Sequence, residues 1–231
     1  MIIGILQTGR PPGGLIPEFG GYSAMLQDLI GPDHNYRVFD VEAGELPKSP
    51  RVCETYVITG SSAGAYDNLP WIAPLEGFLR AARGEVKLVG VCFGHQIMAQ
   101  AFGGVVEKSA QGWGAGLQTY DVWRPAAWMV DSRPVAVAVA HQDQVTAVPP
   151  GAQVLGGNAF TSFGLLAYDQ TSISMQCHPE FSADFAKALF AERWAKENLA
   201  AQAEAAIRSL DAPNDRLRVG DWIRAFLAKA A

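Results

Sequence analysis

Short apolar runs alternate with longer amphipathic segments over the first half of the chain. Runs rich in Val and Ile predict strands, and segments whose apolar residues recur about every 3.6 positions predict helices. The predicted strands are residues 1–9, 35–41, 54–61 and 85–92, and the predicted helices are residues 21–31, 69–83 and 94–104. Because strands alternate with helices, we expect βαβ units and a central parallel sheet.

The pattern changes after Gly104, the glycine that ends the last of these helices. Further strand-like stretches follow one another with turns but without room for helices between them. They are residues 105–123, 133–145, 152–158, 163–169 and 172–177. This part of the chain predicts an antiparallel or mixed extension of the sheet. The expected fold is therefore α/β, with an open, mostly parallel sheet flanked by helices.

The C-terminal part of the chain reads as helical. An alanine-rich stretch, residues 182–210, predicts helix with Ser182 as its N-cap, and residues 215–230 predict a last amphipathic helix. In that last helix, Leu217, Trp222, Phe226 and Leu227 are available for one apolar face. We expect residues 1–195 to form one domain, and residues 196–231 to be a helical extension packed on the same domain.

Composition narrows the class of protein. With 231 residues, 49% of them hydrophobic, the chain can bury a sizeable core without disulfides or a structural metal. The net charge is −5, whereas proteins that bind nucleic acids usually carry a basic surface. No stretch of the sequence approaches the roughly 18 consecutive apolar residues of a membrane span. The three cysteines have no regular spacing, and the N-terminus shows no secretory pattern. We expect a reduced, cytoplasmic protein with no nucleic acid or membrane as partner.

Cys92 stands at a predicted strand-to-helix bend, in the stretch "VGVCFGHQIMAQAFGG". Gly90 and Gly94 lie two residues on either side, as in the glycine–nucleophile–glycine turn that exposes a reactive side chain. The following helix directs the partial positive charge of its N-terminus at the thiol, which favours the thiolate. Taken alone, this stretch leaves two interpretations open, because buried free cysteines commonly serve as small hydrophobic residues.

A candidate base for that thiol follows the last predicted strand, in "MQCHPEF". His178 and Glu180 are separated by one residue, so an extended backbone directs both side chains to one face. The carboxylate could then orient the imidazole toward the thiol, as a nucleophilic cysteine requires. Pro179 favours this extended backbone on both sides. Taken alone, the segment could also be an ordinary surface turn.

Together, "GVCFGHQIMAQAFGG" and "QCHPEF" resemble the class I, triad-type glutamine amidotransferase domain, over at least residues 54–181. The resemblance implies a flavodoxin-like amidotransferase fold for the domain of residues 1–195. It also implies Cys92 as nucleophile, His178 as general base and then acid, and Glu180 as the partner that orients the histidine. In that family the cysteine attacks the glutamine side-chain amide, releases ammonia and leaves a γ-glutamyl thioester that water hydrolyses. No cofactor or metal is implied.

The resemblance extends to residues around the reaction centre. The backbone N–H of Phe93 is one candidate oxyanion donor, since it starts the helix after the nucleophile. In "ITGSSAGAYD", Gly60 and Ser61 stand where the family has paired glycines, although Ser61 restricts the backbone more than glycine would. A plain strand-end loop is the alternative for this segment.

Three further residues are candidates for contact with the substrate. Gln96 belongs to a "GHQ" run that lies beside the substrate in the family, and His95 in the same run is expected to be a packed helix residue. His141 and Asp143, in "AHQDQV", resemble the family segment near the glutamine α-amino group. For that segment a structural turn is the alternative.

Several interpretations of function remain at this level. The chain carries no G-x-x-x-x-G-K-[ST] loop and no "SGGxDS"-type loop for activating an acceptor with a nucleotide, and it resembles stand-alone relatives of the amidotransferase domain of GMP synthase. The leading prediction is hydrolysis of glutamine or another γ-glutamyl small molecule. The alternatives are a γ-glutamyl peptidase acting on glutathione-type conjugates, a subunit that supplies ammonia to a separate synthase partner, and a non-catalytic binding module, which the intact Cys–His–Glu set disfavours.

Overall fold

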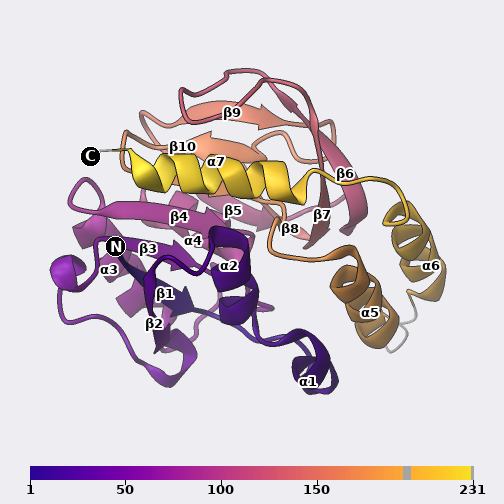
Figure 1. Cartoon of the computed structure of the whole chain (residues 1–231), viewed down its shortest axis with the longest axis horizontal. Helices are drawn as coiled ribbons and strands as arrows, with labels where there is room; N and C mark the ends of the chain where they lie inside the picture. Colours follow the sequence, from indigo (N-terminus) through magenta and orange to yellow (C-terminus); the bar gives the residue numbers. More distant parts are fainter. Residues whose placement is uncertain (195–198, 230–231) are drawn as a thin grey trace.

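The computed structural model describes residues 1–194 and 199–229. Within these residues, a nine-stranded sheet has the order β2-β1-β3-β4-β11-β10-β9-β6-β7 (Figure 1). Its strands are β1 (Ile2–Gln7), β2 (Asn35–Asp40), β3 (Thr55–Ile58), β4 (Lys87–Val91), β6 (Gly114–Val122), β7 (Val135–His141), β9 (Gln153–Gly157), β10 (Leu165–Ala167) and β11 (Ser172–Met175). A separate two-stranded ribbon pairs β5 (Val105–Lys108) with β8 (Asp143–Ala147).

The sheet has a parallel half and an antiparallel half. Strands β2, β1, β3, β4 and β11 run parallel to one another, whereas β10, β9, β6 and β7 continue the sheet from β11 with antiparallel pairs. The predicted α/β fold with a mixed extension is therefore confirmed. The change of direction falls between β11 and β10, so β11, which comes late in the sequence, lies beside β4 at the middle of the sheet.

Helices cover both faces of the parallel half. The helices are α1 (Ile16–Phe19), α2 (Tyr22–Ile30), α3 (Ile72–Ala82), α4 (Phe93–Ala101), α5 (Ala183–Trp194), α6 (Ala200–Ser209) and α7 (Arg216–Ala228), with short 3₁₀ turns at Gly13–Leu15, Val41–Ala43 and Pro50–Val52. Side chains alternate across each strand, so Ile3 and Ile5 pack with α2 and α7, and Leu6 packs with α3 and α4 on the opposite face. Burial on both faces explains why β1, β3 and β4 are mostly apolar, whereas β2, at the edge of the sheet, is more polar and more exposed.

The C-terminal helices pack on the rest of the protein. Helices α5 and α6 pack on each other, α6 also contacts β6, and α7 lies across the near face of the sheet against α2 and β7 (Figure 1). Trp222, Phe226 and Leu227 are buried in α7, but Leu217 is 60% exposed, so its assignment to the apolar face is wrong. The predicted boundary between residues 195 and 196 lies outside the described residues.

Lys87 ties the end of α7 to the start of β4. Its side chain is buried, and its Nζ donates hydrogen bonds to the carbonyl oxygens of Phe226 and Leu227 at 2.9 and 2.8 Å. These carbonyls belong to the last turn of the helix, where backbone acceptors lack intrahelical partners. A lysine at this position therefore caps the helix and neutralises its negative end. Among the helices of the described residues, none has the length and apolar character needed to cross a bilayer.

Candidate active site

The sheet brings Cys92 and His178 to the same edge. Cys92 follows β4 and His178 follows β11, and these adjacent strands run parallel with Val91 opposite Met175. The Cys92 backbone N–H donates to the Met175 carbonyl at 2.9 Å, which extends the pairing of the two strands by one residue. The carboxyl ends of parallel strands are the usual place for ligands in open α/β sheets. Two motifs far apart in the sequence therefore meet at one end of the sheet.

The backbone at Cys92 is strained. With φ of 53° and ψ of −103°, it is the one non-glycine residue with positive φ among those described. The flanking glycines permit close packing of the turn: a Cβ at Gly90 would lie 2.5 Å from the carbonyl oxygen of Gly94, and a Cβ at Gly94 would lie 2.4 Å from that of Ile58. Strain of this kind is retained where the surrounding structure imposes it, and it clusters at functional sites.

His178 is held between a carboxylate and a thiol. Its Nδ1 donates to Glu180 Oε1 at 2.7 Å, and both side chains are buried. The imidazole lies beside Cys92, with which it lines a small cavity, and it stacks on Phe181 with ring centroids 4.0 Å apart. Burial lowers the pKa of His178, but the negative charges of Cys92 and Glu180 outweigh this effect and raise the pKa to about 10. The arrangement therefore favours the protonated form of the His178 imidazole.

Helix α7 holds the segment that carries this histidine through hydrogen bonds from Arg216. The Arg216 side chain donates to the carbonyl oxygen of Pro179 through Nε at 3.1 Å and to that of Glu180 through Nη2 at 3.4 Å. The His178 backbone N–H donates to the Ala138 carbonyl on β7 at 2.8 Å. The segment between His178 and Glu180 is therefore anchored both to the sheet and to the last helix.

The loop after β3 lies against the reaction centre. A Cβ at Gly60 would be 3.1 Å from Cε1 of His178 and 3.8 Å from the Cβ of Cys92, so the Gly60 backbone is next to both side chains. Thr59 holds the loop through a 3.0 Å hydrogen bond from its hydroxyl to the Gly60 carbonyl. The Ser61 hydroxyl accepts a hydrogen bond from the Ala63 N–H at 3.1 Å, and Ser61 lines the cavity over Cys92.

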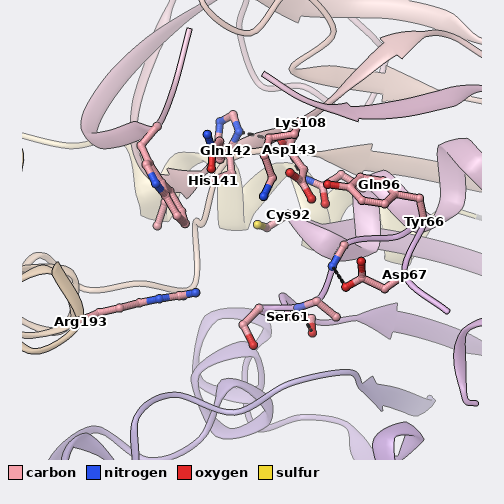
Figure 2. Close-up of a pocket in the computed structure, with 15 residues that line it drawn as sticks. Ser61, Tyr66, Asp67, Cys92, Gln96, Lys108, His141, Gln142, Asp143 and Arg193 are labelled. Carbon is pink, nitrogen blue, oxygen red and sulfur yellow. Dashed lines mark hydrogen bonds between the residues drawn. The ribbon is translucent and has the colours of Figure 1, made fainter. Parts of the chain in front are cut away.

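A cavity of about 270 Å³ opens over Cys92 (Figure 2). Residues from five segments of the chain line it: Ser61, Ser62, Ala63, Gly64, Tyr66, Asp67, Cys92, Gln96, Lys108, Trp113, Ala140, His141, Gln142, Asp143 and Arg193. Cys92 lies near the centre of the view, Asp143 and Lys108 lie on one side of it, and Arg193 reaches in from another (Figure 2). Charged groups of both signs therefore surround the thiol.

Gln96, His141 and Asp143 form one hydrogen-bonded group in this cavity. Gln96 Nε2 donates to the Asp143 carbonyl at 2.8 Å, and His141 Nδ1 donates to the same oxygen at 3.1 Å. Burial lowers the pKa of His141 to about 4, so its ring is neutral near pH 7. Burial raises the pKa of the Asp143 carboxyl group, which lines the same cavity as Tyr66. The backbone of Asp143 is thus held in place while its side chain faces the cavity.

The remaining predicted residues do not line the main cavity over Cys92. The Phe93 side chain is fully buried in the core, so only its backbone N–H, at the start of α4, could reach a ligand. His178 lines a smaller cavity of about 20 Å³ with Cys92, and Glu180 lies behind the histidine. His95 is a packed helix residue as expected, with Nδ1 2.8 Å from the Ser174 hydroxyl. Among the described residues, no cluster of His, Cys, Asp or Glu side chains is arranged to hold a metal.

Sequence reasoning missed three residues that line these cavities. Tyr22, on α2, lines the small cavity with Cys92 and His178, and Arg193, on α5, lines both the small cavity and the main one. Lys108 ends β5 on the opposite side of the thiol. None of these residues belongs to a motif, and only the packing of separate elements brings them to the site.

A protein-family model and similar sequences can be compared with this chain. The family model described as glutamine amidotransferase class-I matches residues 65–196. Gamma-glutamyl peptidase 5 of Arabidopsis thaliana is 28% identical, with 72% of this chain and 70% of the relative covered. The glutamine-hydrolyzing GMP synthase subunit of Archaeoglobus fulgidus is 27% identical, with 72% of this chain and 87% of the relative covered.

The fold has close structural counterparts. The crystal structure of a glutamine amidotransferase from Thermotoga maritima superposes with a TM-score of 0.79 at 15% identity, and 99% of each chain is covered. At that identity the likeness concerns the fold alone. The family model covers more than half of the chain, and it includes the cysteine bend and the histidine segment described above. This chain belongs to the class-I glutamine amidotransferase family.

Proposed function

We propose that this protein hydrolyses the side-chain amide of glutamine, or another γ-glutamyl amide, through a thioester on Cys92. The observation that carries the proposal is the placement of three side chains at one sheet edge, where Glu180 holds His178 by a hydrogen bond and His178 lies beside Cys92. A nucleophile, a base and a group that orients the base form the minimal set for covalent acyl transfer.

The reaction follows from the charges at the site. The Cys92 thiolate attacks the γ-carbonyl carbon, and the negative charge moves to the carbonyl oxygen. The N–H groups of Phe93 and of the Gly60–Ser61 loop are the candidate donors to that oxygen. The carbon–nitrogen bond then breaks as the His178 imidazolium gives its proton to the leaving nitrogen. Water, deprotonated by the now neutral His178, hydrolyses the thioester and releases glutamate.

The main cavity supports a zwitterionic γ-glutamyl group as substrate. Asp143 and Lys108 line it together, and the Lys108 charge offsets part of the rise that burial causes in the pKa of the Asp143 carboxyl. An α-ammonium group would pair with Asp143, and an α-carboxylate would pair with Lys108. Gln96 and His141 hold the Asp143 backbone in position for this contact.

Two alternatives differ in what leaves the site. The similarity to a γ-glutamyl peptidase favours an amino acid or peptide as leaving group. The similarity to a GMP synthase subunit favours ammonia that passes to a separate synthase partner. Hydrolysis at Cys92 is common to both. For the compartment, the free buried thiols of Cys53 and Cys177 support a reduced, cytoplasmic setting.

The deciding experiment is to incubate the protein with L-glutamine and with γ-glutamyl peptides, and to measure released glutamate. The wild-type protein should show a γ-glutamyl adduct by intact mass after acid quenching, and Cys92→Ala should show neither adduct nor turnover. Cys53→Ala, which removes a buried thiol away from the site, is the matched control and should retain both. Equal turnover by wild type and Cys92→Ala on every compound would refute the proposal.

A further inference from the structure

The position of His178 shows on which side of Cys92 a leaving group departs. If the proposed function holds, the imidazolium must deliver its proton to the leaving nitrogen, so that nitrogen lies on the His178 side of the thiol. The small cavity that His178 and Cys92 share is on this side, and Tyr22 and Arg193 also line it. Any group attached to the leaving nitrogen would therefore extend toward these two residues.

A second cavity lies on the other side of two residues that line the small cavity, Tyr22 and Arg193. This second cavity of about 350 Å³ is lined by Arg10, Pro11, Pro12, Tyr22, Ser62, Glu192 and Arg193. It shares Tyr22 and Arg193 with the small cavity, and it shares Ser62 and Arg193 with the main cavity over Cys92. Ammonia occupies about the volume of one water molecule, roughly 30 Å³. The second cavity therefore has room for a group much larger than ammonia.

The charged residues Lys108, Asp143 and Arg193 are distributed differently over the three cavities. Lys108 and Asp143 line the main cavity but neither the small nor the second one, whereas Arg193 lines all three. The Arg193 side chain extends from α5 toward Cys92 (Figure 2). Its guanidinium lies 5.7 Å from the centroid of the Trp113 ring. Contact with an aromatic ring limits the directions that the guanidinium can take, which prepares it to bind an anion.

Tyr22 gives independent support for this placement of Arg193. Burial raises the pKa of the Tyr22 hydroxyl, as do the nearby charges of Glu180 and Cys92, while Arg193 acts in the opposite direction. The hydroxyl group is therefore within electrostatic reach of both the reaction centre and the guanidinium. A neutral tyrosine hydroxyl at this point can donate a hydrogen bond to an anionic group that lies between them.

We propose that Arg193, with Tyr22 beside it, binds the α-carboxylate of an amino acid joined through its amino group to the γ-carboxyl of glutamate. In such a substrate the carboxylate is separated from the scissile nitrogen by one carbon atom, so it must bind close to Cys92 on the leaving side. The carbon–nitrogen bond breaks, the nitrogen takes the His178 proton, and the free amino acid departs through the second cavity. A guanidinium pairs with a carboxylate through two parallel hydrogen bonds.

A matched pair of substrates tests this subsite. γ-Glutamyl-alanine carries the carboxylate, and γ-glutamyl-ethylamide is the same compound without it. We expect wild-type kcat/KM to be at least tenfold higher for γ-glutamyl-alanine. Arg193→Gln should lower kcat/KM for γ-glutamyl-alanine by about 10- to 100-fold, the usual loss for a charge-assisted hydrogen bond. For γ-glutamyl-ethylamide the change should stay under about threefold.

Three further variants test whether the effect is specific to the Arg193 side chain and to the leaving side of the substrate. Lys108→Gln should lower kcat/KM for both substrates equally, because it acts on the glutamyl half that they share. Arg208→Gln, on the exposed face of α6, removes a cation outside these cavities and should change neither value. Arg193→Lys keeps the positive charge but removes the paired N–H donors of the guanidinium, so it should retain part of the preference for γ-glutamyl-alanine. Unchanged thermal melting of Arg193→Gln would show that the fold is intact.

The outcomes separate the inference from the proposed function. Equal losses on both substrates in Arg193→Gln, or no wild-type preference for γ-glutamyl-alanine, would overturn the leaving-group subsite. Turnover of glutamine that depends on Cys92, without any turnover of γ-glutamyl-alanine, would overturn the subsite and leave the proposed function standing. Cleavage of either compound by Cys92→Ala at the wild-type rate would instead overturn the proposed function.

Discussion

Gly60 lies so close to the His178 imidazole that a Cβ atom added to it would be 3.1 Å from Cε1 of the ring. The same atom would be 3.8 Å from the Cβ of Cys92, so a side chain at residue 60 would contact both members of the proposed thiol–imidazole pair. A side chain at this position can be accommodated only if the ring or the loop moves. The absence of a side chain at residue 60 therefore lets the loop and the imidazole keep their present positions.

We expect Gly60→Ala to lower kcat by about 10- to 1,000-fold, because it shifts either His178 or the proposed oxyanion donors. Steady-state kinetics with glutamine or a γ-glutamyl peptide would measure the loss. Gly13→Ala is the matched control, since a Cβ at Gly13 meets no atom within 4 Å. If Gly60→Ala retained wild-type kcat, the close approach of the loop would have no role in the reaction.

The alkaline limit of activity should depend on Glu180. The imidazolium of His178 is stabilised by the negative charges of Cys92 and Glu180, which together overcome the effect of burial and raise its pKa to about 10. Glu180→Gln removes one of these charges with little change of shape, so the pKa of His178 should fall. Because the proton donor is lost above that pKa, the alkaline limb of kcat/KM should move to lower pH.

A pH series of kcat/KM for wild type and Glu180→Gln would measure this shift, and the pH dependence of Cys92 alkylation by iodoacetamide would report on the same ion pair. Asp184→Asn is the control: it removes a carboxylate from the first turn of α5 and should not shift the alkaline limb of the kcat/KM profile. An alkaline limb that does not move in Glu180→Gln would contradict an electrostatic role for Glu180.

The backbone strain at Cys92 should appear as a stability difference between two inactive variants. Both Cys92→Ala and Cys92→Gly remove the thiol, but only glycine adopts a φ of 53° without steric cost. We expect Cys92→Gly to be more stable than Cys92→Ala by about 1 kcal/mol, because relief of strain exceeds the entropy that glycine adds to the unfolded chain. Urea denaturation of the two variants would measure the difference. A less stable glycine variant would mean that the turn is not strained.

Lys87 should stabilise the protein through the end of α7. Lys87→Met keeps the length of the side chain but leaves the carbonyl oxygens of Phe226 and Leu227 without their donor. We expect a loss of about 2 kcal/mol in the free energy of unfolding, typical of removing buried hydrogen bonds to a charged group. Thermal or urea unfolding would measure this loss. Lys187→Met, which removes an exposed ion pair with Asp211, is the control and should shift the midpoint much less.

The sequence by itself determined those features that depend on local interactions. The alternation of strands and helices follows from the periodicity of apolar residues, because each element must bury one face or both. The bend at Cys92 follows from Gly90 and Gly94, whose missing side chains allow the backbone contacts of a tight turn. The contact between His178 and Glu180 follows from their spacing, because residues two apart in extended chain share a face.

The tertiary structure decided which distant segments meet. No local pattern specifies that β11 pairs with β4, and without that pairing Cys92 and His178 would not share a sheet edge. The same holds for Arg193, which stands on an alanine-rich helix without any motif and reaches the cysteine only through the packing of α5. The exposure of Leu217 also depends on how α7 lies on the sheet. The physical reason is that periodicity records which side of an element is buried, whereas the identity of its neighbour depends on contacts summed over the whole fold.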